Sequence, residues 1–226
     1  MALRKSTGNM YPWVTHTHSA LGGECPHKCS YCYVNNPRFG RPKRYCGELR
    51  LIEEEMHTNL GAGRTIFKEN CNDLFAKLVP DNFILAILNH CSQYPDNTYI
   101  LQTKNPDRAV EWVEDMPKDV MLGTTIETNL SMSERSLAPH PEARIRGLRD
   151  WGGKKFITIE PIMDFNTEIM IGWITEIRPD FVNIGADSKG HGLPEPSPRK
   201  VADLIAGIQL AGIEIREKHN LDRLLR

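Results

Sequence analysis

The chain alternates between two patterns of hydrophobic and polar residues. Short runs of β-branched and apolar residues end in polar residues, and each is followed by a stretch whose apolar residues recur with helical periodicity. The first pattern is typical of buried strands, and the second of helices that cover them. We predict strands at residues 11–17, 64–70, 98–105, 120–129, 155–163 and 180–187.

The clearest intervening helix begins at Asp81, which we expect to be its N-cap, and its apolar stripe continues to Cys91. In the next helix Asn105 is the expected N-cap, and Pro106 occupies the first helical position. Helices thus separate the predicted strands along most of the chain. Similar periodicity predicts further helices at residues 48–60, 141–151, 167–178 and 198–212.

This alternation indicates parallel βα units and an α/β fold, which we expect to form one domain over residues 1–226. The pattern fits an open doubly wound sheet and also an incomplete (β/α) barrel, since eight full βα units do not fit in 226 residues. In both folds ligands bind at the carboxyl ends of the strands. Functional residues are therefore expected directly after each strand.

The composition, with 40% hydrophobic and 25% charged residues, is that of an ordinary globular protein. No apolar run approaches the roughly 20 residues of a transmembrane helix, and the first residues, MALRKSTGNMYPW, lack the apolar stretch of a signal peptide. We therefore expect a cytoplasmic protein with no membrane partner. The formal net charge of −1 gives no global attraction to nucleic acid, so such a partner requires a local basic patch.

Three of the six cysteines, Cys25, Cys29 and Cys32, lie in the segment GGECPHKCSYCYV at residues 22–34. Cytoplasmic cysteines are kept reduced, so a tight group of them is more typical of a metal site than of disulfides. The group follows the first predicted strand, in the longest connection of the chain. Three thiolates can hold three corners of a [4Fe-4S] cluster and leave the fourth iron open to a substrate or cofactor.

The motif CPHKCSYC resembles the cluster motif of the radical S-adenosylmethionine (radical SAM) superfamily. The resemblance implies that Cys25, Cys29 and Cys32 bind the cluster, that S-adenosylmethionine (SAM) chelates the fourth iron, and that Tyr31 lies against the adenine. It also implies a partial (β/α)6 TIM-like barrel. The segments LQTKNP, TTIETN, TIEPIMDF and NIGADSKG are more narrowly similar to a branch that has phage-encoded members and is distantly similar to spore photoproduct lyase.

A structural zinc site is the alternative interpretation of these cysteines, because zinc takes four Cys or His ligands in a closed tetrahedron. Zinc motifs usually contain two spaced pairs, however, and the sequence has no second C-x2-C. The corresponding function would be a non-catalytic, zinc-stabilised nucleic-acid-binding protein. The candidate fourth ligands are Cys46, His16, His18 and His27.

By the same resemblance, polar residues after the second and third strands are candidates for binding SAM. Asn70 and Asn72 stand in KENCND, where the superfamily often has a glycine-rich segment that binds the SAM amino group. Asn72 is equally interpreted as the N-cap of a following helix, with Asp73 as a charge in its first turn. Lys104 would pair with the SAM carboxylate or with Glu127.

The later strands add acidic and amide candidates for the cofactor site. Glu127 and Asn129 alternate on one face after the fourth strand and suit a ribose diol. Glu160 interrupts an apolar run, so this buried carboxylate needs a partner, either Lys104 or the substrate. Asp187 lies in GADSKGHGLPEP, whose glycines and prolines predict a loop over the barrel mouth; a plain surface loop is the alternative.

The resemblance also implies the reaction. An electron from an external flavodoxin- or ferredoxin-like donor would split SAM into methionine and a 5′-deoxyadenosyl radical, which removes a hydrogen atom from a substrate that the sequence does not identify. Cys71, at the mouth of the second strand, is a candidate for returning a hydrogen atom to the product radical. Filling space in the core is its alternative role.

Residues 35–50 form a basic segment that is the candidate contact for a nucleic-acid partner or substrate. It carries five basic residues against a single acidic one, Glu48, and has Phe39 and Tyr45 interleaved. Basic and aromatic side chains together hold the phosphates and bases of nucleic acids. A solvated basic loop is the alternative interpretation.

Overall fold

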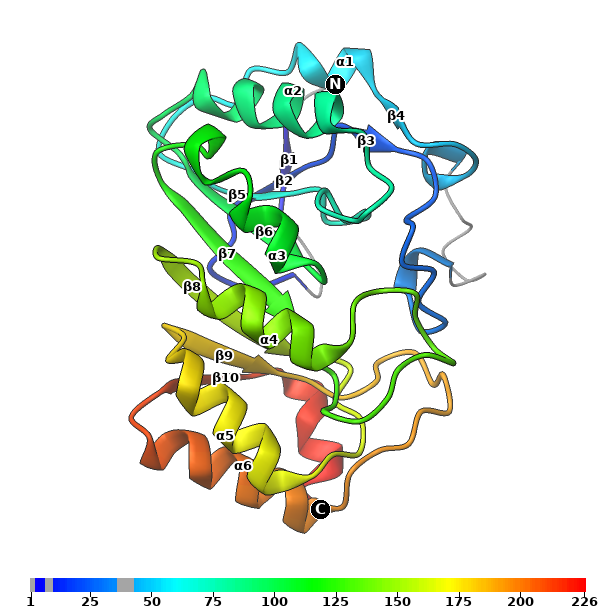
Figure 1. The fold of residues 1–226 in the computed structure, drawn as a ribbon, viewed down its shortest axis with the longest axis vertical. Helices are drawn as coiled ribbons and strands as arrows, with labels where there is room; N and C mark the ends of the chain where they lie inside the picture. The colour runs from blue at the N-terminus through cyan, green and yellow to red at the C-terminus, as the bar shows by residue number, and fades with distance from the viewer. Residues whose placement is uncertain (1–2, 7–9, 36–42) are drawn as a thin grey trace.

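The computed structural model describes residues 3–6, 10–35 and 43–226. In these residues an eight-stranded sheet forms the centre of the molecule, and it is parallel throughout except for its first strand (Figure 1). The sheet is open, because its edge strands, β1 and β10, do not pair with each other. In sheet order the strands are β1 (Arg4–Lys5), β2 (His16–His18), β5 (Thr65–Lys68), β6 (Thr98–Thr103), β7 (Val120–Thr125), β8 (Lys154–Ile159), β9 (Phe181–Ile184) and β10 (Glu214–Glu217).

One helix follows each parallel strand from β2 to β9, so the fold is the predicted α/β partial barrel. The α-helices are α1 (Glu53–Met56), α2 (Asp81–Ser92), α3 (Pro106–Val110), α4 (Pro141–Arg149), α5 (Thr167–Ile177) and α6 (Pro198–Leu210). The connection from β2 to α1 also contains a short antiparallel ladder of β3 (Leu21–Gly22) and β4 (Arg50–Leu51). Short 3-10 helices are η1 (Tyr33–Asn35), η3 (Lys43–Tyr45), η4 (Val113–Asp115) and η5 (His219–Leu224).

The two faces of the sheet have separate apolar cores. Alternate strand residues point to opposite faces, so Leu101 packs in the large cluster with the helices, whereas Ile100 packs on the other face. On that second face Tyr11 and Trp13 stack with ring centroids 5.3 Å apart, and Trp13 meets Phe181 edge to face. Aromatic side chains thus pack together on the inner face of the partial barrel.

On the same face of the sheet, polar side chains replace the aromatic ones closer to the carboxyl ends of the strands. The Tyr11 hydroxyl donates to Gln102 Oε1 (3.0 Å) and lies 2.8 Å from Thr158 Oγ1. Gln102 Nε2 in turn donates to Thr125 Oγ1 (2.9 Å). Because side chains alternate, the next residue in this direction is Lys104, which directly follows β6 at the carboxyl edge of the sheet.

Several predicted boundaries are wrong, each for a packing reason. The strand predicted at 11–17 is ordered as β2 only from His16, because Tyr11 and Trp13 leave the strand to stack on the aromatic core. The helix predicted at 48–60 is only α1, because Leu51 pairs with Leu21 in the β3–β4 ladder. β10 was not predicted, since its sequence, EIRE, lacks an apolar run.

Of the two predicted N-caps, one is wrong and one is confirmed. Asp81 is the first residue of α2 rather than its N-cap, which is Pro80 in an extended conformation. Asn105 is the N-cap of α3 as predicted, with Pro106 at the first helical position. Its side chain nevertheless donates to the Phe75 carbonyl (2.9 Å) instead of capping the helix. Among the described helices, none has the length and apolar character that a membrane crossing requires.

Candidate active site at the carboxyl ends of the strands

The three cysteines of the motif line one cavity together with Cys71, which comes from the loop after β5. All four are free thiols. Backbone hydrogen bonds from Cys32 N to the Cys29 carbonyl (3.1 Å) and from Asn35 N to the Cys32 carbonyl (3.0 Å) wind the motif into tight turns. The sequence therefore brings four sulfur atoms to the carboxyl edge of the sheet.

The loop that follows β7 holds the cysteine loop in place, and the two run side by side in Figure 1. Ser30 N donates to the Arg135 carbonyl (2.8 Å), and Leu137 N donates to the His27 carbonyl (2.7 Å). The Cys29 thiol lies 3.2 Å from Ser136 Oγ. These contacts fix the motif against a segment more than a hundred residues later in the chain.

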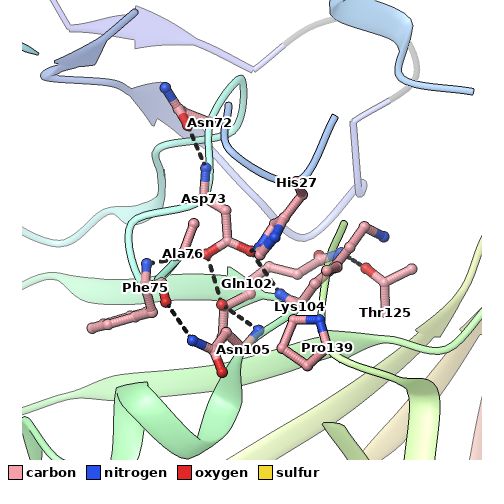
Figure 2. A network of polar contacts seen from close by, with 12 residues as sticks. His27, Asn72, Asp73, Phe75, Ala76, Gln102, Lys104, Asn105, Thr125 and Pro139 are labelled. Atoms are coloured by element: carbon pink, nitrogen blue, oxygen red, sulfur yellow. Dashed lines mark hydrogen bonds and ion pairs between the residues drawn. The ribbon is translucent and has the colours of Figure 1, made fainter. Parts of the chain in front are cut away.

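Asp73 joins the cysteine loop to the end of β6, as Figure 2 shows. Its Oδ2 accepts a hydrogen bond from Lys104 N (2.7 Å) and lies 2.8 Å from His27 Nε2. Its Oδ1 accepts from Thr103 Oγ1 (2.6 Å) and Phe75 N (3.1 Å). Burial by itself would raise the pKa of Asp73, but the neighbouring His27 and these hydrogen bonds outweigh it and lower the pKa.

Glu127 is the centre of a second buried polar group. Its carboxylate accepts from the Tyr31 hydroxyl (2.6 Å) and from Arg144 Nη1 (2.9 Å), and it forms an ion pair with Lys104. Burial opposes the charge of Glu127, yet the two cations and the hydrogen bonds lower its pKa to about 2. Burial and the Glu127 charge raise the pKa of Tyr31, which therefore keeps its proton and donates.

This group carries one uncompensated positive charge at neutral pH, because two cations surround one carboxylate. Arg144 is fully buried, whereas the Lys104 side chain is 16% exposed. Lys104 is therefore the cation of the group that an entering anion would meet.

The Cys71 thiol lies beside an aromatic hydroxyl. Tyr33 Oη is 3.2 Å from Cys71 Sγ and donates to the Asn70 carbonyl (2.7 Å). Tyr33 follows the last cysteine of the motif directly. The cysteine loop and the Cys71 loop are thus in contact through this side chain.

The family model described as a protein of unknown function (DUF5131) matches residues 11–208. The chain belongs to this family. The match runs from the aromatic residues before β2 into α6, so the matched part of this chain contains the cysteine loop, Asp73 and the Glu127 group. None of the curated proteins matches the chain in sequence.

Solved structures of radical SAM enzymes are similar to this DUF5131 chain in fold. A spore photoproduct lyase variant superposes with a TM-score of 0.59 at 10% identity, covering 91% of this chain and 65% of the lyase. Another lyase variant, solved with bound AdoMet and a dinucleoside spore photoproduct, gives a TM-score of 0.56 at 10% identity, covering 92% of this chain. The chain therefore spans 65% of the length of either lyase chain.

Two further radical SAM structures show the same likeness. Streptococcus suis SuiB bound to S-adenosylmethionine gives a TM-score of 0.54 at 13% identity and covers 91% of this chain and 47% of SuiB. A radical SAM methyltransferase from Sphaerobacter thermophilus gives 0.56 at 13% identity, with coverages of 94% and 69%. These likenesses confirm the expected radical SAM fold, and at such identities they extend to the fold alone.

The cysteines of this DUF5131 chain fit a cluster better than a single ion. Ligands of one zinc ion must converge on it at about 2.0–2.3 Å. The described part of the chain contains no group of three His, Cys, Asp or Glu residues arranged in that way. Cysteines that bind different irons of a cluster do not have to converge on one point, and three thiols on one cavity meet that requirement.

The fourth ligands of the zinc alternative are engaged elsewhere or lie away from the cavity. Cys46 is not among the described residues that line it. Each of the histidines already has a protein partner: His27 contacts Asp73, His18 contacts Lys68 and Glu55, and His16 contacts Thr15. None of the three histidines is among the described residues that line the cavity with the motif cysteines.

Protons have to leave the thiols before any metal binds. Burial raises the pKa of Cys25 to about 12 and also raises the pKa of Cys32. Without a metal both side chains are therefore neutral thiols near pH 7. Binding of iron would release these protons.

Asn70 and Asn72 lie close to the cysteine loop but make structural contacts. Asn70 Oδ1 accepts from Ser19 Oγ (3.0 Å), and Asn72 Nδ2 donates to the Gly23 carbonyl (3.1 Å). The segment from 71 to 79 consists of turns and α2 begins only at residue 81. The alternatives that made Asn72 a helix N-cap and Asp73 part of a first helical turn are therefore wrong.

Glu160 has a different partner from the one predicted. Its carboxylate forms an ion pair with Lys218 Nζ (2.7 Å), a residue that directly follows β10. Lys104, one of the two partners predicted for Glu160, pairs with Glu127 instead, and the substrate contact stays a prediction. The error follows from the missed strand, because without β10 no cation was expected on that side of Glu160.

Asn129 and Asp187 form hydrogen bonds outside the Glu127 group. Asn129 exchanges hydrogen bonds with the backbone of Asn166, donating to its carbonyl (2.8 Å) and accepting from its N–H (2.9 Å). Asp187 accepts from Lys189 N (3.0 Å) and contacts His191 Nδ1 (2.8 Å). The structure does not bring these two side chains into the Glu127 group.

Arg144 is the site residue that sequence reasoning missed. It lies on the buried stripe of α4 together with Pro141, Ile145 and Leu148. An arginine on an apolar helical stripe requires a buried acceptor, and that pattern is the signal in the sequence. The carboxylate that satisfies it, Glu127, belongs to the preceding loop, so the pairing itself could not be read from the helix.

Proposed function

We propose that this DUF5131 chain is a radical SAM enzyme, in which Cys25, Cys29 and Cys32 bind a [4Fe-4S] cluster whose open iron takes up SAM. The observation that carries the proposal is the gathering of the three motif cysteines on one cavity at the carboxyl ends of a radical SAM-like partial barrel. When bound, the cluster and SAM would supply the chemistry: a single electron from an external flavodoxin- or ferredoxin-like donor splits SAM into methionine and a 5′-deoxyadenosyl radical that abstracts hydrogen from a substrate.

The Glu127 group would bind the methionine end of SAM. It has one excess positive charge, and its partly exposed cation, Lys104, suits a carboxylate. The Tyr31 ring is held by its hydrogen bond to Glu127, and Lys104 Nζ lies 5.6 Å from the ring centre. We infer that Glu127 orients Tyr31 and Lys104 together, with the Tyr31 ring facing the adenine.

The other predicted cofactor residues would act at the edges of this site. Asn70 and Asn72 are candidates for the SAM amino group, since they belong to the loop that contacts the cysteine motif. Asn129, Glu160 and Asp187 have the contacts described above, so a role in SAM binding requires each of them to exchange partners.

Cys71 is our candidate for the hydrogen donor. It lines the same cavity as the motif cysteines, and its thiol touches the Tyr33 hydroxyl. Transfer of the thiol hydrogen atom would quench a substrate radical and leave a thiyl radical at Cys71. One electron from the external donor and one proton from solvent would then restore the thiol. We expect Cys71→Ala to keep SAM cleavage while losing turnover of substrate.

Nucleic acid is the substrate class we propose through the basic segment. Arg38, Phe39 and Arg41 lie outside the described residues. Of the three described cations, Arg44 binds Glu55 (2.8 Å) and Arg50 donates to backbone carbonyls, so these two have structural roles, whereas Lys43 is exposed. Filter binding of single-stranded DNA and RNA at low ionic strength tests the proposal. If the protein binds neither DNA nor RNA, the proposal is refuted.

The experiment for the cofactor proposal is anaerobic reconstitution with iron and sulfide. We expect about four irons and four sulfides per chain. Cys29→Ala should lose the cluster, whereas Cys46→Ala, which removes a cysteine outside the cavity, should retain it. A chain that takes up stoichiometric zinc, fails to assemble a cluster, and loses its metal in Cys46→Ala would contradict the proposal.

A further inference from the structure

The carboxylate of Asp73 lies between two parts of the site that come from distant segments. His27, one of its partners, stands inside the cysteine motif between Cys25 and Cys29. Another partner is the backbone N–H of Lys104, whose side chain is the exposed cation of the Glu127 group (Figure 2). A single side chain therefore contacts both the cluster loop and the residue proposed to hold the SAM carboxylate.

The contacts of Asp73 use its full capacity as an acceptor. Each carboxylate oxygen takes two donors: Oδ1 accepts from Thr103 and Phe75, and Oδ2 faces His27 and Lys104. Asp73 itself is 7% exposed and His27 is 4% exposed. Such an arrangement allows little variation in the distance between the segments, because any shift of one donor breaks a buried hydrogen bond.

Stability alone does not account for a buried carboxylate at this position. The desolvation cost of a buried carboxylate offsets much of the gain from its partners, so its net contribution to the free energy of unfolding is limited. Buried polar networks do confer one specific geometry. A fixed geometry is what the site needs, since SAM has to reach the cluster and Lys104 at the same time.

We propose that Asp73 is a positioning residue that sets the cysteine loop, through His27, relative to Lys104, and so fixes where the methionine end of SAM is held. The inference rests on the proposed radical SAM function. It identifies Asp73, which lies outside the cysteine motif, as a residue that affects the affinity for SAM without contacting SAM.

The first test is Asp73→Asn in the reconstituted protein. The amide nitrogen of asparagine cannot accept a hydrogen bond. In either orientation of the amide, this nitrogen faces two donors that hydrogen-bonded to a carboxylate oxygen in the wild type. We expect the KM for SAM in 5′-deoxyadenosine formation to rise about tenfold or more, with the rate at saturating SAM changed less than about threefold. The SAM-induced change in the electron paramagnetic resonance spectrum of the reduced cluster should require correspondingly more SAM.

Variants of His27 separate positioning from general damage. His27→Ala should also raise the KM for SAM, and His27→Gln, whose amide can donate to Asp73, should restore it. The double variant Asp73→Asn with His27→Ala should be no worse than the poorer single variant, because both act through one contact. If Asp73→Asn does not fold, the Ala and Gln variants of His27 still decide the question.

The matched control is Asp119→Asn at the opposite end of β6. Asp119 accepts from Thr98 Oγ1 (2.6 Å) at the amino end of the sheet, far along the strand from Lys104. Its loss should leave the KM for SAM unchanged. An unchanged KM in Asp73→Asn, or equal effects of the Ala and Gln variants of His27, would overturn the inference while wild-type SAM cleavage upholds the proposed function. A wild-type chain that assembles no cluster would overturn both.

Discussion

At the scale of single residues, Glu127 determines how the charges of the site are balanced. It is fully buried and is compensated by Lys104 and Arg144 on opposite oxygens. A charge in this position is tolerated only because its partners stay in place. Removing the carboxylate leaves a fully buried guanidinium without its counter-ion, which is one of the most destabilising changes available in a protein interior.

We therefore expect Glu127→Gln to lower the free energy of unfolding by about 3 kcal/mol or more, as breaking a buried ion pair usually does. The matched control is Glu176→Gln, which removes an exposed ion pair with Arg149 (2.8 Å) and should cost less than about 1 kcal/mol. Urea denaturation of the three proteins measures both values. Equal losses in the two variants would show that the Glu127 group is not a tightly coupled buried network.

Residue by residue, the sequence predicted the chemistry of the site better than its pairings. Glu127 was one of the two partners predicted for Lys104, and the two side chains form an ion pair. The sequence could not show that Arg144 shares Glu127, or that Lys218 rather than Lys104 binds Glu160. Such pairings depend on which distant segments become neighbours, and residue type alone carries no information about that.

At the scale of elements, apolar periodicity correctly predicted the strands and helices that pack against each other in the core. The strands from β5 to β9 and the helices from α2 to α6 bury continuous apolar stripes, so they appear in the sequence. β10 escaped prediction because it has a single apolar residue, Ile215, which packs against the core on the helix side of the sheet. On the other face the polar residue Arg216 covers the Phe181 ring at 3.5 Å, and apolar periodicity does not detect such a contact. The segment at Tyr11 and Trp13 was wrongly predicted as part of a strand, because its residues are apolar in order to stack in the aromatic core.

The approach of α4 to α3 depends on a glycine. A Cβ atom at Gly147 would lie 2.5 Å from the backbone nitrogen of Asp107, so we expect Gly147→Ala to be destabilising although alanine favours helices. Gly172 in α5 has no atom within 4 Å of such a Cβ, and Gly172→Ala should stabilise the protein by about 0.5–1 kcal/mol. Thermal melting of both variants measures these shifts. A stabilised Gly147→Ala protein would refute the close packing of the two helices.

At the scale of the whole molecule, the buried carboxylates make the stability of the fold depend on pH. The folded-state pKa of Glu127 is about 2, below the ordinary value of 4.5, so its contribution is present above pH 4.5 and is lost as the pH falls toward 2. The shift corresponds to a contribution on the order of 3 kcal/mol. The lowered pKa of Asp73 acts in the same direction.

We accordingly expect the free energy of unfolding of the wild type to decrease from pH 5 to pH 3 more steeply than that of Glu127→Gln. Urea denaturation curves across this range give both slopes, and their difference isolates Glu127 from the other carboxylates. The same slope in both proteins would mean that Glu127 is not held as an anion in the fold. This measurement needs no cluster, so it tests the polar group independently of the cofactor.

The central claim concerns the whole assembly: a partial barrel that gathers three cysteines at its open end in order to cleave SAM. The most direct measurement is chromatography for 5′-deoxyadenosine after anaerobic reconstitution and reduction with dithionite in the presence of SAM. We predict that the wild type forms this product and that Cys29→Ala does not. Intact SAM in a wild-type sample that holds a complete cluster would contradict the account.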